Sequence, residues 1–580
     1  MPNYYCDEKD ILQLVALIKE HNIKRAVVSP GSTNISFAAC LLYDKDFEVF
    51  SAVDERSAAY MACGIAAETG EPVIISCTGA TAARNYAPAL TEAFYRKLPI
   101  LAVTSSQHFG RVGQYIPQVT DRTNPLNDIF RKNVQISVSH TEEDEWSNNV
   151  KINDALLELT RDGGGPVLIN IETTFTQNFN VHTLPSVRKI SRYYINDRLP
   201  VISARKTAVF VGSHLPFSDE LTKAVDRFCS KYNAIVICDH TSNYFGKFRA
   251  FGGLLEWQIA YHPSCRNPEL VIHIGEMSGA YYSFPKSKVW RVNPDGEIRD
   301  TFRNLENVFS MNEIDFFTKY SDGEFNARDN SYYDEWISEQ NKVQAGLQEL
   351  PFSNAWIAQQ TASKLPRNSE IHFGILNSLR MWNLFDTPNK VFGFSNVGGF
   401  GIDGSISTLI GASLVNSSKL YFCVLGDLST FYDINSLGNR HIRNNVRILV
   451  VNNGTGFEMR HKNNRGEIFK EDADILFAAA GHFGNKSRTV LKHFSEDLGF
   501  EYMSAETKQE YLAKVSRFIT DDVCEKPILF EVFVDVADEN LSFTLTRNAV
   551  QDASASAKKA VKSILGEKGV QTVKGLLGRK

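Results

Sequence analysis

Two short polar motifs in the last third of the chain carry residue types that suit a metal ion. Gly426-Asp427-Leu428-Ser429 follows the apolar run 420–425, and Asn452-Asn453-Gly454-Thr455 follows the apolar run 446–451. Such runs are typical of buried parallel strands, and open α/β sheets bind ligands where their strands end. A carboxylate, an amide oxygen and a backbone carbonyl would bind Mg²⁺ and leave positions for a diphosphate. The alternative is a helix-capping Asp427 and a turn-forming asparagine pair in an ordinary α/β domain.

A second acidic group follows a strand-like run near the amino terminus. The run 47–53 ends in Asp54-Glu55-Arg56, and the small-residue segment 57–67 behind it predicts a helix. An acid that exchanges a proton in an apolar site is favoured in its neutral form, because desolvation disfavours the charge. Glu55 is our candidate for such a group. The alternative is a solvated glutamate in the first turn of a helix, where the helix dipole favours its charge.

Small-residue loops recur at the ends of further predicted strands. Ser29-Pro30-Gly31-Ser32 follows the run 25–28, and Cys77-Thr78-Gly79-Ala80-Thr81 follows the run 72–76. The segment 395–404, which is rich in glycine, precedes the first metal motif. One such loop alone usually indicates only a turn. Several of them, in this order and over most of the chain, favour loops that admit a ligand.

Together these motifs resemble the thiamine diphosphate enzymes. The resemblance implies an α/β fold of three doubly wound parallel-sheet domains of the thiamine diphosphate-binding fold. It implies that Asp427, Asn453 and Thr455 hold Mg²⁺ against the diphosphate, and that Glu55 bonds N1′ of the aminopyrimidine ring and favours the form that takes the C2 proton. The family's usual Gly-Asp-Gly reads Gly-Asp-Leu in this chain. The implied cofactor-binding residues are Ser29, Gly31, Thr78, Gly79, Asn85, Ser378, Gly401, Ile402, Gly426 and Ser429.

Within that family the chain most resembles the menaquinone-pathway synthases that join 2-oxoglutarate to isochorismate. The resemblance is carried by segments in all three predicted domains, namely Ser29-Pro30-Gly31-Ser32, Asp54-Glu55-Arg56, Asn377-Ser378-Leu379, residues 401–408, and Gly426-Asp427-Leu428-Ser429 with Tyr432-Asp433. Those synthases handle carboxylate-rich substrates with arginines, whose forked donors match a carboxylate. Here the corresponding places carry Thr33, Trp382, Val397 and Gln107-His108.

Arg380 is not a simple replacement for these arginines. It lies two positions before Trp382, and two positions on a helix turn a side chain by about 200°. We therefore expect decarboxylation of a 2-oxo acid and carboligation of the acyl group to a less acidic carbonyl-type acceptor. The alternatives are the synthase activity itself with rearranged carboxylate ligands, or a flavin-dependent 2-oxo acid oxidase with a membrane-binding tail.

The expected pocket combines residues of the first and third predicted domains. His108 is a candidate proton shuttle near neutral pH, with a polar surface histidine as the alternative. The candidate catalytic residues are Glu55, Gln118 and His108. The candidate substrate-binding residues are Thr33, Gln107, Arg111, Gln114, Trp382, Val397 and Phe457.

Composition excludes several other classes of protein. The chain has 580 residues, a formal net charge of −5 and nine cysteines. Without a basic excess it is no general nucleic-acid binder. The first ten residues carry acids and lack the apolar core of a signal peptide, and no window has 18 uncharged apolar residues. The odd number of scattered cysteines favours free thiols in a reduced compartment, so we expect a cytoplasmic protein.

The order of predicted strands and helices divides the chain into four parts. We expect a pyrimidine-binding domain at 1–185, a central α/β domain at 186–345, and a diphosphate- and Mg²⁺-binding domain at 346–550. The central domain lacks the glycine fingerprint of a dinucleotide fold, although some relatives bind FAD there. The basic tail 551–580 predicts either an amphipathic helix in peripheral contact with a membrane, or a solvated tail. By resemblance, the active sites lie at the subunit interface of a homodimer or tetramer.

Overall fold

The computed structural model describes residues 4–280, 282–323 and 330–550. The chain groups into two compact units, Met1–Arg198 with Asp295–Ser310, and Leu199–Pro294 with Met311–Lys580. The predicted domain boundaries near residues 185 and 345 stay predictions, and the predicted tail 551–580 lies outside the described residues. In the described segments, no helix combines the length and the apolar character that crossing a bilayer requires.

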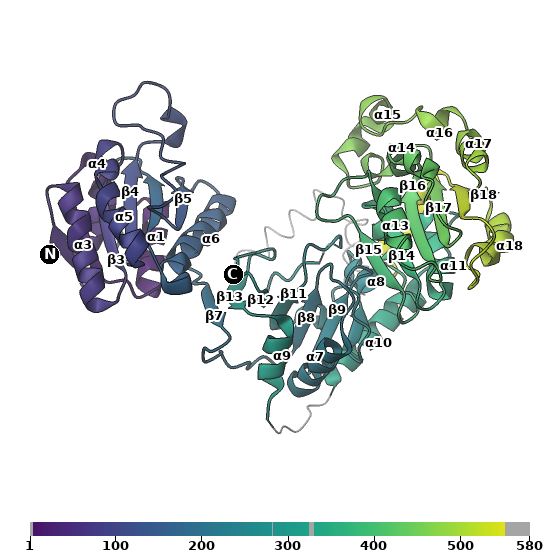
Figure 1. The fold of residues 1–580 in the computed structure, drawn as a ribbon, viewed down its shortest axis with the longest axis horizontal. Helices are drawn as coiled ribbons and strands as arrows, with labels where there is room; N and C mark the ends of the chain where they lie inside the picture. The colour runs from purple at the N-terminus through teal and green to yellow at the C-terminus, as the bar shows by residue number, and fades with distance from the viewer. Residues whose placement is uncertain (1–3, 281, 324–329, 551–580) are drawn as a thin grey trace, which may run out of the picture. The chain divides into compact units, whose positions relative to one another are not determined.

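The first unit contains a six-stranded sheet with the order β2-β1-β3-β4-β6-β5 (Figure 1). Its strands are β1 (Arg25–Val28), β2 (Glu48–Ser51), β3 (Val73–Thr78), β4 (Ile100–Ser106), β5 (Lys132–Ile136) and β6 (Val167–Glu172). Its helices are α1 (Lys9–Glu20), α2 (Ile35–Tyr43), α3 (Glu55–Thr69), α4 (Thr81–Asn85), α5 (Ala87–Arg96) and α6 (Glu142–Glu158), with 3-10 turns η1 (Ser32–Asn34), η2 (Phe109–Arg111) and η3 (Arg161–Gly163). The parallel pair β7 (Ser191–Tyr194) and β13 (Leu305–Ser310) belongs to the same unit.

Helices cover both faces of this sheet. One apolar cluster joins α1, α2 and α6 to the strands through residues such as Ile11, Leu41 and Ile152. A second cluster joins α3 and α5 to the strands through Ala59 and Ala93. Strands β3 and β4 lie between these layers and are buried along their whole length, as parallel strands covered on both faces are.

The second unit contains two further groups of parallel strands. One has the order β10-β9-β8-β11-β12, and the other is a six-stranded sheet with the order β15-β14-β16-β17-β19-β18 (Figure 1). The strands of the first group are β8 (Thr207–Val211), β9 (Ala234–Cys238), β10 (Arg249–Phe251), β11 (Leu270–Ile274) and β12 (Lys288–Val292). The strands of the second are β14 (Glu370–Phe373), β15 (Phe392–Ser395), β16 (Tyr421–Gly426), β17 (Val446–Asn452), β18 (Glu501–Ala505) and β19 (Ile528–Phe533).

The helices of the second unit follow the same alternation with strands. They are α7 (Asp219–Tyr232), α8 (Gly253–Glu256), α9 (Glu313–Ser321), α10 (Ser331–Gly346), α11 (Asn354–Thr361), α12 (Asn377–Trp382), α13 (Ser405–Ser413), α14 (Asp427–Tyr432), α15 (Ala473–Leu476), α16 (Phe483–Lys486), α17 (Val490–Asp497), α18 (Lys508–Phe518) and α19 (Val536–Arg547). The 3-10 turns are η4 (Ser264–Arg266), η5 (Ala362–Lys364), η6 (Ile434–Gly438), η7 (Phe457–Met459) and η8 (Arg465–Asp472). The sheets are purely parallel with interleaved helices, so the predicted α/β class is confirmed.

Candidate active site

The two metal motifs lie side by side at the carboxyl ends of neighbouring strands. Gly426 of β16 is in register with Val451 of β17, so both chains leave the sheet at the same level. Asp427 starts α14 and is buried. Burial raises the pKa of its carboxyl to about 7, although the backbone N–H groups of Asp427, Asn453 and Leu428 act in the opposite direction. Throughout the described chain, no lysine, arginine or histidine forms an ion pair with Asp427.

The asparagine loop is held in a tight turn beside this carboxylate. Asn453 Oδ1 accepts the backbone N–H of Thr455 at 3.2 Å, and Gly454 adopts a left-handed φ of 71° that favours glycine. Asn452 accepts the backbone N–H of Gly454 at 3.0 Å with its Oδ1 and donates to Glu531 Oε1 at 2.7 Å. Asn485 donates to the carbonyl of Gly454 at 2.6 Å. No sequence motif indicated Asn485 at this place, because it comes from the short helix α16, about 30 residues further along the chain.

These residues fit the predicted magnesium site. A buried carboxylate with no cation partner is unfavourable, and a divalent ion would neutralise it. Asn453 Oδ1 and the Thr455 carbonyl lie in the same turn and have the oxygen chemistry that Mg²⁺ prefers. No group of three or more His, Cys, Asp and Glu that could hold a metal occurs in the described residues, and the predicted ligand set has only one such residue. Magnesium binding itself stays a prediction.

The glycine-rich loop 395–404 contacts the same motif. Ser429 donates its hydroxyl hydrogen to the carbonyl of Ile402, so two of the predicted cofactor-binding residues contact each other. Gly404 has a left-handed φ of 76°, and a Cβ on Gly401 would lie 2.5 Å from Asp403 Oδ1. The left-handed backbone favours glycine at position 404, whereas a side chain at position 401 would only have to displace the exposed side chain of Asp403. The structure thus brings Ile402 and Ser429 to the strand end that carries Asp427.

Three predicted pocket residues of the third sheet are buried. Trp382 is fully buried and donates its indole N–H to Asn354 Oδ1 at 3.2 Å. Val397 and Phe457 have 3% exposure each. Arg380 instead pairs with Glu458 Oε2 at 2.7 Å, so Arg380 and Trp382 have different partners, as two positions on a helix require. Contact of these three residues with a substrate stays a prediction, and their burial does not support it.

Ser378 and the tryptophan lie on one short helix, α12, that is held by buried polar contacts. Ser378 is buried at the start of that helix. Glu539 of α19 accepts the backbone N–H of Asn354 at 3.0 Å, and burial raises the pKa of this glutamate to about 7. The side chain of Asn377 acts in the opposite direction and lowers the pKa of Glu539. The network joins α11, α12 and α19, and the sequence patterns did not indicate it.

In the first unit, Glu55 and Asn85 meet as the motifs suggested. Asp54 caps α3 by accepting the N–H of Ser57 at 3.1 Å, which places Glu55 at the first position of the helix. Asn85 donates to Glu55 Oε2 at 3.2 Å. Burial raises the pKa of the neighbouring Cys77 thiol to about 12, and the charges of Glu55 and Arg122 act on it with opposite signs. Cys77 is thus a neutral, buried packing residue.

The two small-residue loops of the first unit approach each other closely. A Cβ on Gly31 would lie 2.0 Å from Thr78 Oγ1, so no side chain fits between the loops. The hydroxyls of Ser29 and Thr78 are buried and have no hydrogen-bond partner in the described structure. Unmet hydrogen-bonding groups at strand ends fit a ligand that supplies the partners. Thr33, a predicted substrate-binding residue, is buried and donates to the carbonyl of Ser105 at 2.9 Å.

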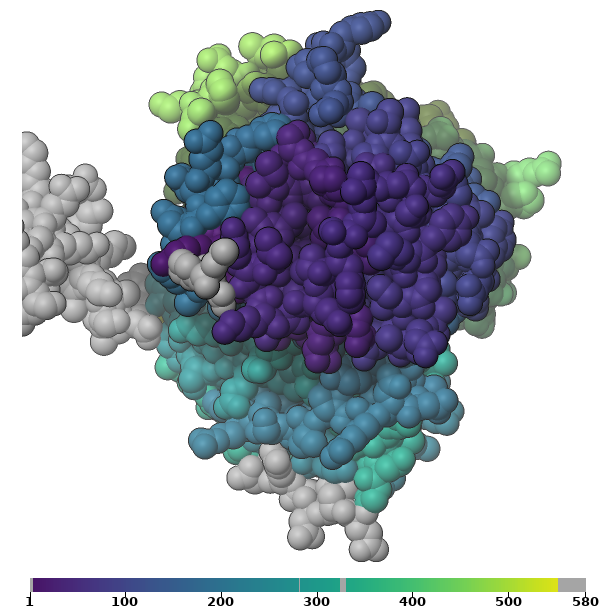
Figure 2. Space-filling view, turned by 90° about the vertical axis from the view of Figure 1, so that its left-hand side faces the viewer, coloured from purple at the N-terminus to yellow at the C-terminus, as the bar shows by residue number. Residues whose placement is uncertain are grey.

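The remaining predicted residues lie on the long segment between β4 and β5. This segment rises from the sheet in Figure 1 and stands out from the surface in Figure 2. Arg111 contacts Gln107, and His108 Nδ1 accepts the N–H of Gly110 at 3.0 Å. Gln114 and Gln118 are exposed, and Gln118 has a positive φ of 65°. Their substrate and catalytic roles stay predictions.

The base of this segment is held by a residue that the motifs did not indicate. Glu172, at the end of β6, is buried and accepts the backbone N–H groups of Phe109 and Val138. The carboxylate of Glu172 therefore holds the segment between β4 and β5 in place at the turn that begins with His108.

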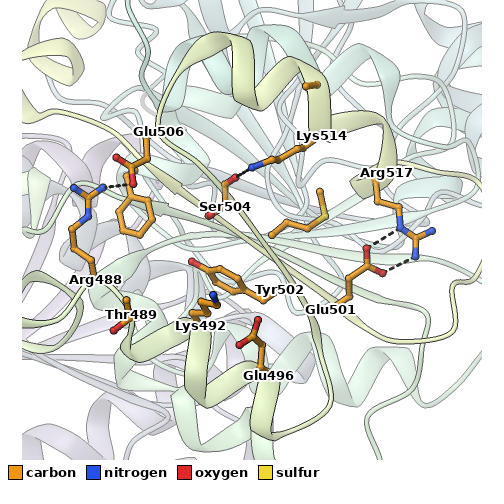
Figure 3. A pocket seen from close by; sticks show the side chains of 13 residues that line it. Arg488, Thr489, Lys492, Glu496, Glu501, Tyr502, Ser504, Glu506, Lys514 and Arg517 are labelled. Atoms are coloured by element: carbon orange, nitrogen blue, oxygen red, sulfur yellow. Dashed lines mark hydrogen bonds and ion pairs between the residues drawn. The ribbon is translucent and has the colours of Figure 1, made fainter.

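A surface pocket of about 600 Å³ lies elsewhere, between β18, α17 and α18 (Figure 3). Four of its charged side chains form ion pairs with one another. Arg517 forms two parallel bonds with Glu501, at 2.9 and 2.6 Å, and Arg488 pairs with Glu506 at 3.1 Å. Because none of the predicted site residues lines this pocket, we do not assign the active site to it.

Comparison with known proteins agrees with this geometry. Residues 12–125 match the family model "Thiamine pyrophosphate enzyme, N-terminal TPP binding domain". The 2-succinyl-5-enolpyruvyl-6-hydroxy-3-cyclohexene-1-carboxylate synthase of Bacteroides fragilis is 31% identical over 566 residues, which cover 92% of this chain and 97% of the relative. The synthases of Bacteroides thetaiotaomicron and Phocaeicola vulgatus are each 30% identical, and cover 91% and 92% of this chain and 96% of the relative. The fold and site define a thiamine diphosphate-dependent enzyme, and the chain belongs to the family that includes these synthases.

Proposed function

We propose that the enzyme decarboxylates a 2-oxo acid and transfers the remaining acyl unit to a carbonyl-type acceptor, with thiamine diphosphate and Mg²⁺. The single observation that supports this most is the buried, unpaired Asp427 beside Asn453 at the ends of two adjacent parallel strands. That arrangement suits a metal ion bound to a diphosphate. Among the described residues, no cationic side chain pairs with this carboxylate.

The chain's own residues divide the work between two regions. Asp427, Asn453 and Thr455 hold the metal, and Ser429 fixes the loop that carries Ile402. The hydroxyls of Ser29 and Thr78 are free to bond a ligand. The cofactor, when bound, supplies the carbon nucleophile that protein side chains lack. Glu55 would share a proton with the ring nitrogen N1′ of the bound cofactor, and Asn85, which donates to Glu55 Oε2, would orient its carboxyl group.

We propose that the acceptor carries fewer carboxylates than the substrates of the related synthases. Thr33, Val397 and Gln107 stand where the resemblance places arginines, and Thr33 and Val397 are buried. Each lost charged hydrogen bond weakens carboxylate binding by about 1.5–3 kcal/mol. The activity of the synthases themselves is the second candidate, and identity of about 30% over more than nine tenths of the chain favours it.

We propose further that each active site forms between two subunits of a homodimer or tetramer, with the first domain of one facing the third domain of the other. Large apolar side chains on α3, just beyond Glu55, support this. Tyr60 and Met61 are 47% and 43% exposed, which is unusual for residues on a helix with a buried opposite face.

The test is CO₂ release from a panel of 2-oxo acids by protein supplied with thiamine diphosphate and Mg²⁺. Carbonyl acceptors and isochorismate are then added, and the products are identified by mass spectrometry. We expect CO₂ from at least one acid and a ligated product with an uncharged or singly charged acceptor. A product formed only with isochorismate would select the synthase activity, and no CO₂ from any acid would reject both.

A further inference from the structure

Arg122 occupies a position in the first unit that no sequence motif indicated. Its side chain reaches back from the segment after β4 to the strand ends, where it donates to Thr104 Oγ1 at 2.7 Å. A Cβ built on Gly79 would lie 2.6–2.9 Å from three atoms of the Arg122 guanidinium. The guanidinium therefore lies directly against the small-residue loop that follows β3. Thr104 in turn donates to Asn170 Oδ1 at 2.5 Å, which fixes the acceptor.

The charge of Arg122 has no anionic partner in the described structure. Burial lowers the pKa of its guanidinium to about 10, while Cys77 raises it and Arg84 lowers it to a smaller degree. Two other buried or half-buried arginines of the same unit form ion pairs. Arg188 meets Asp300 at 2.6 Å, and Arg192 meets Glu158 at 2.9 Å. A largely desolvated guanidinium without an anionic partner is energetically unfavourable. Its paired N–H donors are suited to bind a carboxylate of a ligand.

Arg122 lies at the same strand end as the candidate acid. Cys77, the last residue but one of β3, is acted on electrostatically by both Glu55 and Arg122. Two other arginines are excluded from this role by their surroundings. Arg380 is neutralised by Glu458 at 2.7 Å, and Arg111 is exposed and contacts Gln107. Arg122 is thus a largely buried cation that acts on the same strand end as Glu55 and has no carboxylate partner among the described residues.

We propose that Arg122 binds a carboxylate of a substrate, and that this carboxylate is one the reaction retains. The inference rests on the proposed 2-oxo acid chemistry. A cation that held the leaving carboxylate would stabilise the substrate more than the transition state and so slow the loss of CO₂. A cation that holds a remote carboxylate stabilises both states and sets specificity. The enzyme accordingly uses at least one substrate with a second acidic group.

The experiment compares two donors of equal chain length, 2-oxoglutarate and 2-oxopentanoate, of which only the first has a remote carboxylate. Wild-type protein and Arg122→Gln are assayed for CO₂ release, and binding to the cofactor-loaded protein is measured by calorimetry with the phosphonate analogue of each donor. We expect Arg122→Gln to lower kcat/KM and affinity for the dicarboxylic donor by roughly 10- to 100-fold. We expect changes of about threefold or less with the monocarboxylic donor. Arg122→Lys should recover part of the loss, because it restores charge without the fork.

Arg84→Gln is the matched control, since it removes an exposed positive charge that acts on the same cluster. It should leave the ratio of the two donors unchanged. If Arg122→Gln spares the donors but weakens a carboxylated acceptor by a similar factor, the retained carboxylate belongs to the acceptor and the proposal still holds. The proposal is overturned if Arg122→Gln weakens charged and uncharged substrates by the same factor, or if it weakens neither. A melting curve like that of the wild type excludes misfolding as the cause of any loss. If no 2-oxo acid is turned over, the proposed function is rejected. Calorimetry with the phosphonate analogues still tests whether Arg122 binds a carboxylate.

Discussion

Replacement of Asp427 by asparagine should stabilise the protein in the absence of metal and destabilise it in its presence. The carboxyl pKa is raised from 3.8 to about 7 by burial, so the folded state holds a proton that the unfolded state has lost. The stabilising effect of that proton is complete below pH 4 and is lost as the pH rises through 7. Each pH unit between these values corresponds to about 1.4 kcal/mol, so the charged carboxylate costs about 4 kcal/mol at pH 8.

Asparagine has the same shape and no charge, so the variant avoids this cost. Without metal at pH 8, its melting temperature should exceed that of the wild type, and at pH 5 the difference in free energy of unfolding should shrink from about 4 to about 1.6 kcal/mol. With Mg²⁺ and thiamine diphosphate at one hundred times their dissociation constants, binding should stabilise the wild type by about 2.7 kcal/mol. The stability of the variant should not change. The assay is thermal melting in chelator and in saturating Mg²⁺ with cofactor, at both pH values.

The order of the melting temperatures is the readout, because a chain of two compact units need not unfold in one step. The neighbouring Asp433 supplies a control, since it is also buried but already accepts hydrogen bonds from Ser407 at 2.6 and 2.7 Å. Asp433→Asn should lower the melting temperature with and without metal. A metal-free Asp427→Asn protein less stable than the wild type at pH 8, or a wild type that Mg²⁺ with cofactor does not stabilise, would refute the assignment.

Three further predictions concern the first unit and the subunit interface. Glu55→Gln should bind cofactor with near wild-type affinity in a calorimetric titration but lose about 10²- to 10⁴-fold in CO₂ release, since a general acid-base group contributes that much; full activity would contradict its role. Glu55→Gln and Asp427→Asn subunits, each inactive alone, should regain about a quarter of the wild-type activity after mixing and subunit exchange, because random pairing leaves that share of interfacial sites intact; no recovery after confirmed exchange would place both residues in one subunit's site. Gly31→Ala should cost about 1–3 kcal/mol of stability and weaken cofactor binding, because its Cβ would lie 2.0 Å from Thr78 Oγ1, whereas Gly411→Ala, with open space around an exposed helical position, should be neutral or stabilising in the same melting assay.

Sequence patterns predicted which candidate residues lie at strand ends, and they missed contacts that irregular segments make. Asp427 and Asn453 each follow a buried apolar run, and parallel register alone requires them to be neighbours. Glu55 was predicted in the same way, after a strand-like run, whereas Asn85, at the end of α4, was implied only by the family resemblance. Burial was not predictable from these patterns. Trp382 was expected at a pocket because of its position in a motif, whereas the packing of α12 against α11 buries its indole completely.

Residues that act on the site from irregular segments left no periodic signal. Arg122 lies within a segment without helix or strand, and only the fold reveals that it returns to Thr104 and Gly79. Asn485 reaches the asparagine loop from a four-residue helix, for the same reason. Nothing in the sequence around Arg122 or Asn485 indicates these contacts, because single polar residues in loops are usually solvated. Tertiary contacts of this kind follow from the path of the chain, which short motifs do not encode.

The positive charges near the site limit the kind of substrate that it can hold. Carboxylates need partners when they are removed from water, so the number of unpaired cations sets how many acidic groups a substrate can bury. Although burial raises the pKa of Glu458, hydrogen bonds from His461 and Arg380 hold it below its usual value, so this glutamate is charged and its arginine is already paired. Arg122 lacks such a partner in the described residues. In the first unit, the guanidinium of Arg122 is therefore suited to one carboxylate of a substrate. The proposed role of Arg122 predicts a substrate that retains one acidic group remote from the reacting carbon.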